Sequence, residues 1–257
     1  MQQLLHKPLV EAIFELRWGL VGTDVVTSAR DPGFKILLGR FYDKVKDRYP
    51  KLIELPSSQM PEEMMPYVVR HQFQTAHETW PLLQIGPGIL TANDTSDYTW
   101  PRFKDNLAHA LNAAFSSYPS DIYQFQPAQV VLRYINAIPL DPSRVNLIDY
   151  LRQNLHTDIA IEPSLSSTVI NIAQPSQLNL NLIFPMQSPS GACGISVSTG
   201  RNGDEPALIW QLDAQAAGAD VPLEQASLLE WLEAAHIVIE TWFERLSEGE
   251  LLSSFRG

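Results

Sequence analysis

Charged side chains recur in two short segments of similar sequence, FELRW at residues 14–18 and VVLRY at residues 130–134. Glu11, Glu15 and Arg17 alternate with other residues in and before the first segment, and Arg133 takes the place of Arg17 in the second. Residues that alternate in this way share one face of a β-strand. A guanidinium presents a planar fork of donors that fits a carboxylate or a phosphate. The candidate binding residues are therefore Glu11, Glu15, Arg17, Arg133 and the neighbouring Tyr134.

Two interpretations of these charges remain open. If the two segments pair as neighbouring strands, carboxylates and guanidiniums can form an ion-pair network that fixes how two parts of the chain dock, because buried charges require partners. Alternatively, the same face is a groove that receives the charged groups of a binding partner. The apolar residues expected on this face are Ile13, Val131 and Ile135.

Signatures of catalysis and of cofactor binding are missing from the sequence. It has no phosphate-binding G-x-x-x-x-G-K-[ST] loop, no G-x-G-x-x-G turn and no G-x-S-x-G elbow, so we assign no catalytic residue and no cofactor. His71 and His77 lack the spacing of a structural metal site, and no metal is expected. His236 falls on an apolar helical stripe, which predicts a histidine at the edge of the core. Cys193 has no basic neighbour that would activate it, which favours an inert thiol.

The composition favours an acidic protein of a reducing compartment. The 257 residues carry a formal net charge of −11, so a phosphate backbone would be repelled at long range and nucleic-acid binding is disfavoured. No apolar stretch approaches the roughly 18 residues of a membrane span. The first residues lack the basic and apolar regions of a secretory signal, and there is one cysteine. We therefore expect a cytoplasmic protein that binds neither membrane nor nucleic acid.

Hydrophobic periodicity divides the chain into short strands and four helices. Alternation predicts strands at 9–18, 52–55, 67–75, 82–85, 89–92, 129–138, 159–162, 167–173, 178–184, 194–198 and 207–212. Spacings of three and four predict helices that begin near Asp31, Thr99, residue 147 and residue 220, with Asp31 and Thr99 as N-caps. The last of these helices is expected to end the chain.

In terms of these elements, each half of the chain contains a strand, a helix, four or five strands and a further helix. Pro119 and Pro127 enclose a segment that separates a predicted helix from a predicted strand, which is typical of a boundary. The predicted halves are residues 1–119 and 120–257, within one continuous domain. The order resembles the tandem β-α-β4-α units of the TATA-binding-protein fold, in which a duplication forms one curved antiparallel sheet with helices on one face. The predicted class is α+β, and another α+β sandwich is the alternative.

Four motifs also resemble a sporadically distributed family of uncharacterised bacterial proteins of similar length. They are PLVEAIFELR at 8–17, LQIGPG at 83–88, YTW at 98–100 and LRYIN at 132–136. The resemblance spans most of the chain and implies no particular ligand or site residue. Sporadic occurrence is typical of genes exchanged between bacteria.

The function expected from these observations is non-enzymatic binding of a protein or peptide partner. An acidic surface suits a basic partner, and with the sporadic family this favours an accessory or neutralising member of a bacterial defence or toxin-like gene pair. The alternative is a small-molecule-binding protein or enzyme with a pocket at the central strands, anchored by the same charged residues. The broad apolar face of the last helix leaves a homodimer open.

Overall fold

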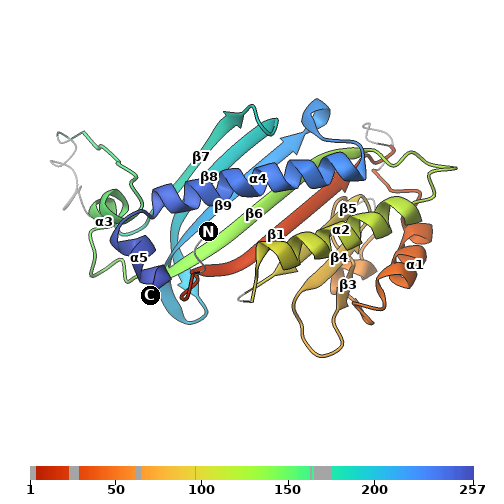
Figure 1. The fold of residues 1–257 in the computed structure, drawn as a ribbon, viewed down its shortest axis with the longest axis horizontal. Helices are drawn as coiled ribbons and strands as arrows, with labels where there is room; N and C mark the ends of the chain where they lie inside the picture. The colour runs from red at the N-terminus through yellow and green to blue at the C-terminus, as the bar shows by residue number, and fades with distance from the viewer. Residues whose placement is uncertain (1–3, 23–28, 62–64, 96, 163, 165–174) are drawn as a thin grey trace.

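The structure is a computed structural model that describes residues 4–22, 29–61, 65–95, 97–162, 164 and 175–257. Its nine strands form one antiparallel sheet in the order β2-β3-β4-β5-β1-β6-β9-β8-β7 (Figure 1). The predicted α+β class is therefore confirmed.

The elements have the following bounds. The strands are β1 (Leu9–Trp18), β2 (Lys51–Glu54), β3 (His71–Gln74), β4 (Leu82–Gly86), β5 (Ile89–Asp94), β6 (Pro127–Pro139), β7 (Asn179–Met186), β8 (Gly191–Asn202) and β9 (Glu205–Ala217). The helices are α1 (Phe34–Val45), α2 (Trp100–Ser117), α3 (Leu147–Asn154), α4 (Gln225–Leu246) and α5 (Glu250–Arg256), with short 3-10 turns at Pro56–Gln59 and Gly218–Asp220.

The two segments of similar sequence pair directly at the centre of the sheet, where β1 lies between β5 and β6. Phe14 is opposite Leu132, and Glu15 is opposite Val131. Burial follows the pleat, because alternate residues of β1 from Ala12 onward are fully buried and those between them are half-buried. One face of the central strands thus belongs to the core and the other does not.

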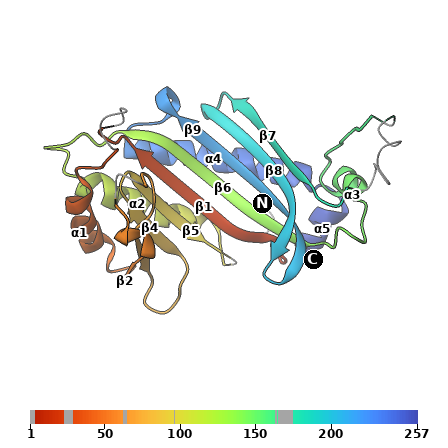
Figure 2. The ribbon, with the colours of Figure 1, turned by 180° about the vertical axis from the view of Figure 1, so that it is seen from behind.

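The helices α1, α2 and α4 all cover the same face of the sheet, which Figure 1 shows from the helix side and Figure 2 from behind. Apolar side chains fill the space between the two layers: on β9, for example, Trp210 stacks against Phe243 of α4 with ring centroids 5.9 Å apart. The opposite face is crossed by none of the described helices. We call it the open face.

A buried carboxylate joins the beginning of α1 to the sheet. Asp31 is 4% exposed and accepts hydrogen bonds from Trp18 Nε1 at 2.7 Å and from the Tyr118 hydroxyl at 2.8 Å. It also accepts from the backbone N–H groups of Gly33 and Gly88 at 3.0 and 3.1 Å. The N-cap of α1 is Gly33, so the prediction that Asp31 caps this helix is wrong, and its carboxylate instead connects four segments.

Several predicted boundaries also need correction. Residues 159–162 form no strand, and the strand predicted at 67–75 is limited to His71–Gln74. The strand predicted at 167–173 lies outside the described residues. Thr99 is the N-cap of α2 by position, without a side-chain hydrogen bond.

The long helix α4 does not end the chain, because α5 follows it. Beside α5 lies the segment before β1, since the His6 backbone N–H donates to the Phe255 carbonyl at 3.0 Å.

Candidate functional site

The open face carries four of the five predicted binding residues, because Glu11, Glu15 and Arg17 of β1 share it with Arg133 of β6. The ion-pair network between the strands, one of the two interpretations of these charges, does not form among the described residues. Arg17 Nε instead contacts Glu15 Oε1 at 2.7 Å within the same strand, and the Asn93 amide donates to Glu11 Oε1 at 2.7 Å.

Arg133 is half-buried and has no ion pair with any residue that the structure describes. Its Nε atom is buried without a hydrogen-bond partner in the described part of the chain. Asp213 stands opposite it on β9, above Gly194, where a Cβ atom would come within 2.8 Å of the carboxylate. The open face therefore carries a guanidinium that forms no ion pair with a carboxylate of the described residues.

Tyr134 lies on the helix side of the sheet, because neighbouring strand residues point to opposite faces. Its hydroxyl is buried beneath α4 and belongs to a different site from the four charged residues. The structure thus separates Tyr134 from the group in which the sequence suggested it.

A pocket of about 530 Å³ lies beside Tyr134, between the sheet, α4, the start of α2 and the segment before β1. Its walls are largely apolar and include Leu4, Leu9, Pro101, Leu212, Ile239 and Phe243. Drug-sized ligands occupy pockets of roughly 300–1,000 Å³ that combine apolar walls with a few polar groups.

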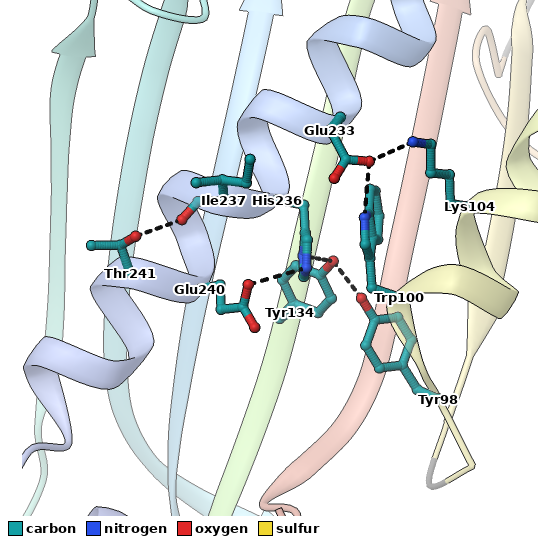
Figure 3. A network of polar contacts seen from close by, with 9 residues as sticks. All are labelled: Tyr98, Trp100, Lys104, Tyr134, Glu233, His236, Ile237, Glu240 and Thr241. Atoms are coloured by element: carbon teal, nitrogen blue, oxygen red, sulfur yellow. Dashed lines mark hydrogen bonds and ion pairs between the residues drawn. The ribbon is translucent and has the colours of Figure 1, made fainter. Parts of the chain in front are cut away.

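A chain of hydrogen bonds runs along one side of this pocket, from α4 through β6 to the loop before α2 (Figure 3). The Tyr134 hydroxyl lies 3.0 Å from His236 Nδ1 and 2.7 Å from the Tyr98 hydroxyl. On the other nitrogen, His236 Nε2 lies 3.4 Å from Glu240 Oε2. Three elements that are distant in sequence therefore meet through one polar chain.

Burial favours the uncharged forms of three members of this chain. Desolvation lowers the pKa of His236 to about 4, although the nearby Glu233 carboxylate opposes this shift. Desolvation likewise raises the pKa values of Tyr98 and Tyr134 well above the ordinary value. The pKa of the Glu240 carboxyl is raised by the same cause and by its acidic neighbours on α4. These hydroxyls and the imidazole can exchange hydrogen bonds but are poorly placed to carry charge.

Trp100 fixes the imidazole from its other side. The indole stacks on His236 with centroids 4.0 Å apart and donates from Nε1 to Glu233 Oε2 at 3.1 Å. Lys104 reaches the same carboxylate oxygen at 2.6 Å. Because Trp100 and Lys104 belong to α2 while Glu233 and His236 belong to α4, these contacts hold two helices at a set distance over the pocket.

Two further polar groups line the pocket near the beginning of β1. Asn136 is 3% exposed, and its Nδ2 atom has no hydrogen-bond partner among the described residues. Lys7 donates from Nζ to the Tyr98 carbonyl at 2.7 Å.

Sequence reasoning placed His236 at the edge of the core, which the structure confirms, but it did not identify the pocket. One feature of the sequence could have pointed to Asn136. It is a polar residue on the face of β6 that points into the core, where Leu132 and Tyr134 are also buried.

Other kinds of site find less support. The described residues contain no group of three His, Cys, Asp or Glu side chains that could hold a metal ion. Burial raises the pKa of the Cys193 thiol to about 12, with a smaller effect of Asp213, which agrees with an inert cysteine. Among the helices of the described residues, none has the length and hydropathy needed to cross a bilayer.

Comparison of the sequence with models of known protein families finds no match, and a search of the curated proteins finds no relative.

Proposed function

We propose that the chain is a non-enzymatic binding protein whose ligand is a small, largely apolar molecule held in the pocket beneath α4. The observation that carries this proposal is the cavity of about 530 Å³, with apolar walls and a buried Asn136 amide that has no partner in the described chain. An unsatisfied buried donor costs roughly 1–3 kcal/mol, which a ligand acceptor would recover.

The protonation states favour binding over catalysis. A general base works best with a pKa near the working pH, whereas burial lowers the pKa of His236 to about 4. The pKa values of Tyr98 and Tyr134 are shifted upward, away from neutrality. The hydrogen-bonded chain therefore suits the orientation of a ligand better than proton transfer to it.

A pocket-filling variant tests this proposal. Leu9 lines the pocket, whereas its neighbour Val10 is 36% exposed and does not, so Leu9→Trp and Val10→Trp form a matched pair. We expect an apolar environment-sensitive dye to bind the wild type and Val10→Trp with one-to-one stoichiometry and Leu9→Trp at least about tenfold more weakly, because the indole occupies the ligand volume. Equal dye binding by both variants, or no saturable binding by the wild type, would contradict the proposal.

A second candidate function uses the open face. There Arg133 supports the binding of a protein or peptide with an exposed carboxylate, in keeping with an accessory or neutralising member of a bacterial gene pair. Mass spectrometry of what copurifies at native expression separates the two candidates. A stoichiometric protein that is lost with Arg133→Met and kept with Leu9→Trp favours the open face, whereas a small molecule with the reverse dependence favours the pocket.

We also infer that the two halves are copies of one ancestral unit of the TATA-binding-protein type. The strand order supports this inference, since the first strand of each half, β1 or β6, lies at the centre with the last strand of that half, β5 or β9, beside it. The second half contributes one strand fewer among the described residues, and the strand predicted at 167–173 falls outside them.

A further inference from the structure

We propose that the ligand of the pocket beneath α4 is a monocarboxylic acid with an apolar body, whose carboxylate binds Lys7 and Asn136. This inference rests on the proposed function and adds the chemical class of the ligand. Lys7 and Asn136 both line the pocket, and both come from the part of the molecule where the chain enters β1.

Lys7 supplies an unneutralised positive charge. Of its three N–H donors, one is used by the Tyr98 carbonyl at 2.7 Å. Lys7 has no ion pair with a carboxylate in the part of the chain that the structure describes. An ammonium group beside apolar walls is stabilised by a nearby anion, because an unpaired charge in such surroundings is costly. A ligand carboxylate can accept hydrogen bonds from the remaining N–H donors of Lys7.

Asn136 supplies a second donor close to the segment that carries Lys7. Asn136 is paired with Leu9 in the sheet, and the residue after it donates its backbone N–H to the Pro8 carbonyl at 2.9 Å, so the amide stands close to the segment that carries Lys7. Its Nδ2 atom is buried and lacks a partner among the described residues. A carboxylate has two acceptor oxygens, which matches one ammonium and one amide donor.

The side of the pocket formed by α4 gives the ligand its orientation. Glu240 and His236 lie on α4, where a second carboxylate would meet the negative charge of Glu240 whenever that group is ionised. The walls nearby are formed by Leu212, Ile239 and Phe243. An acid with its carboxylate at Lys7 and its apolar body against these side chains satisfies both ends, whereas a dicarboxylate or an alkylammonium satisfies only one.

Displacement of the bound dye by three matched decyl compounds tests the inference at neutral pH. We expect decanoate to displace the dye from the wild type at a concentration about tenfold lower than decanol, because charge-assisted hydrogen bonds are the stronger ones. Decylammonium should be the weakest competitor. Lys7→Met should abolish the preference for decanoate over decanol, whereas the exposed Lys35→Met, which changes the net charge equally, should keep it.

Asn136→Leu gives a second test with two readouts that move in opposite directions. Leucine resembles asparagine in shape and removes the unpaired donor, so the ligand-free protein should melt at a higher temperature while decanoate binds several-fold more weakly. A purely structural asparagine would instead give a lower melting temperature and an unchanged preference for the acid.

The outcomes also separate this inference from the proposed function. Equal displacement by decanoate and decanol, or an acid preference that survives Lys7→Met, overturns the carboxylate inference and leaves the apolar pocket standing. Failure of all three compounds to displace the dye, together with equal dye binding by Leu9→Trp and Val10→Trp, overturns both.

Discussion

His236 meets titratable or charged side chains from two directions, with Tyr134 of β6 on one side and Glu233 and Glu240 of its own helix on the other. Burial dominates, and the pKa of the imidazole falls to about 4 from an unfolded value of 6.5. Between these two pH values His236 is protonated in the unfolded chain and neutral in the folded chain. His236 therefore lowers the free energy of unfolding as the pH falls through this window, by up to about 3 kcal/mol.

Removal of the imidazole should flatten this pH dependence. We expect His236→Gln to lose less stability than the wild type between pH values of about 6.5 and 4, because glutamine does not titrate. Denaturant unfolding of both proteins across the window measures the difference. The carboxyl of Glu240, whose pKa is raised by burial, acts in the opposite sense, since its protonation favours the folded state on acidification.

Repetition of the comparison in a Glu240→Gln background removes this opposing contribution. An unchanged pH slope after His236→Gln in both backgrounds would show that the imidazole is not buried in its neutral form.

At the scale of single residues, the sequence predicted which residues of one strand share a face. It did not predict which residues of distant segments lie close together. Alternation places Glu11, Glu15 and Arg17 on one face of β1, because the pleat fixes the side of each residue. Arg133 joins this face because it pairs with Ile13 in the register between β1 and β6. Lys7 and Asn136 could not be brought together in this way, since their proximity depends on the register between β1 and β6.

Asp31 acts at the scale of elements, because its carboxylate accepts from β1, from the turn between β4 and β5, from the start of α1 and from the end of α2. Asp31→Asn replaces one acceptor oxygen by a donor, which leaves two buried donors facing an N–H group. We expect the free energy of unfolding to fall by roughly 2–4 kcal/mol, as measured by denaturant titration.

The matched control for this variant is Asp43→Asn on α1. Its carboxylate pairs with Lys46 at the surface, where an ion pair contributes little, so stability should stay nearly unchanged. A similar small effect for Asp31→Asn would mean that its hydrogen bonds with Trp18, Gly33, Gly88 and Tyr118 are replaced by water at little cost.

Periodicity predicted most elements of the chain and misjudged some of their ends. Long stretches such as β1, α2 and α4 repeat their pattern often enough to be recognised, and their bounds agree with the structure to within a few residues. Residues 159–162 alternate over only four positions, which is too short to distinguish a strand from an extended loop. Asp31 lies two residues before Gly33, which is the N-cap of α1. The sequence could not show that the Asp31 carboxylate also binds segments that are distant in the chain.

At the scale of the whole molecule, the sheet depends on both halves of the chain. β1 pairs with β6 along most of its length, and α4 from the second half packs against α2 from the first. The order of strands was beyond the sequence alone, since it depends on which strand edges meet. A duplicated fold, which the similarity of the segments at 14–18 and 130–134 suggested, would place these segments side by side, and β1 and β6 do pair.

Separation of the halves tests this dependence. We expect residues 1–119 expressed alone to aggregate or to unfold without cooperativity, because β1 would lose its partner β6 and become an unprotected edge strand. Coexpression with residues 120–257 should yield a soluble complex with the far-ultraviolet circular dichroism of the intact chain. A first half that melts cooperatively by itself would show instead that each half is an independent folding unit.

The backbone hydrogen bond from His6 to Phe255 brings the first and last described segments of the chain side by side. A short linker could close the polypeptide into a ring at this place, and a cut in the exposed turn at 121–122 would then open it elsewhere. In such a circular permutant the second half would be synthesised before the first. The pocket would keep all its walls, because Tyr98 and His236 come from different halves and meet by packing, whichever half leaves the ribosome first.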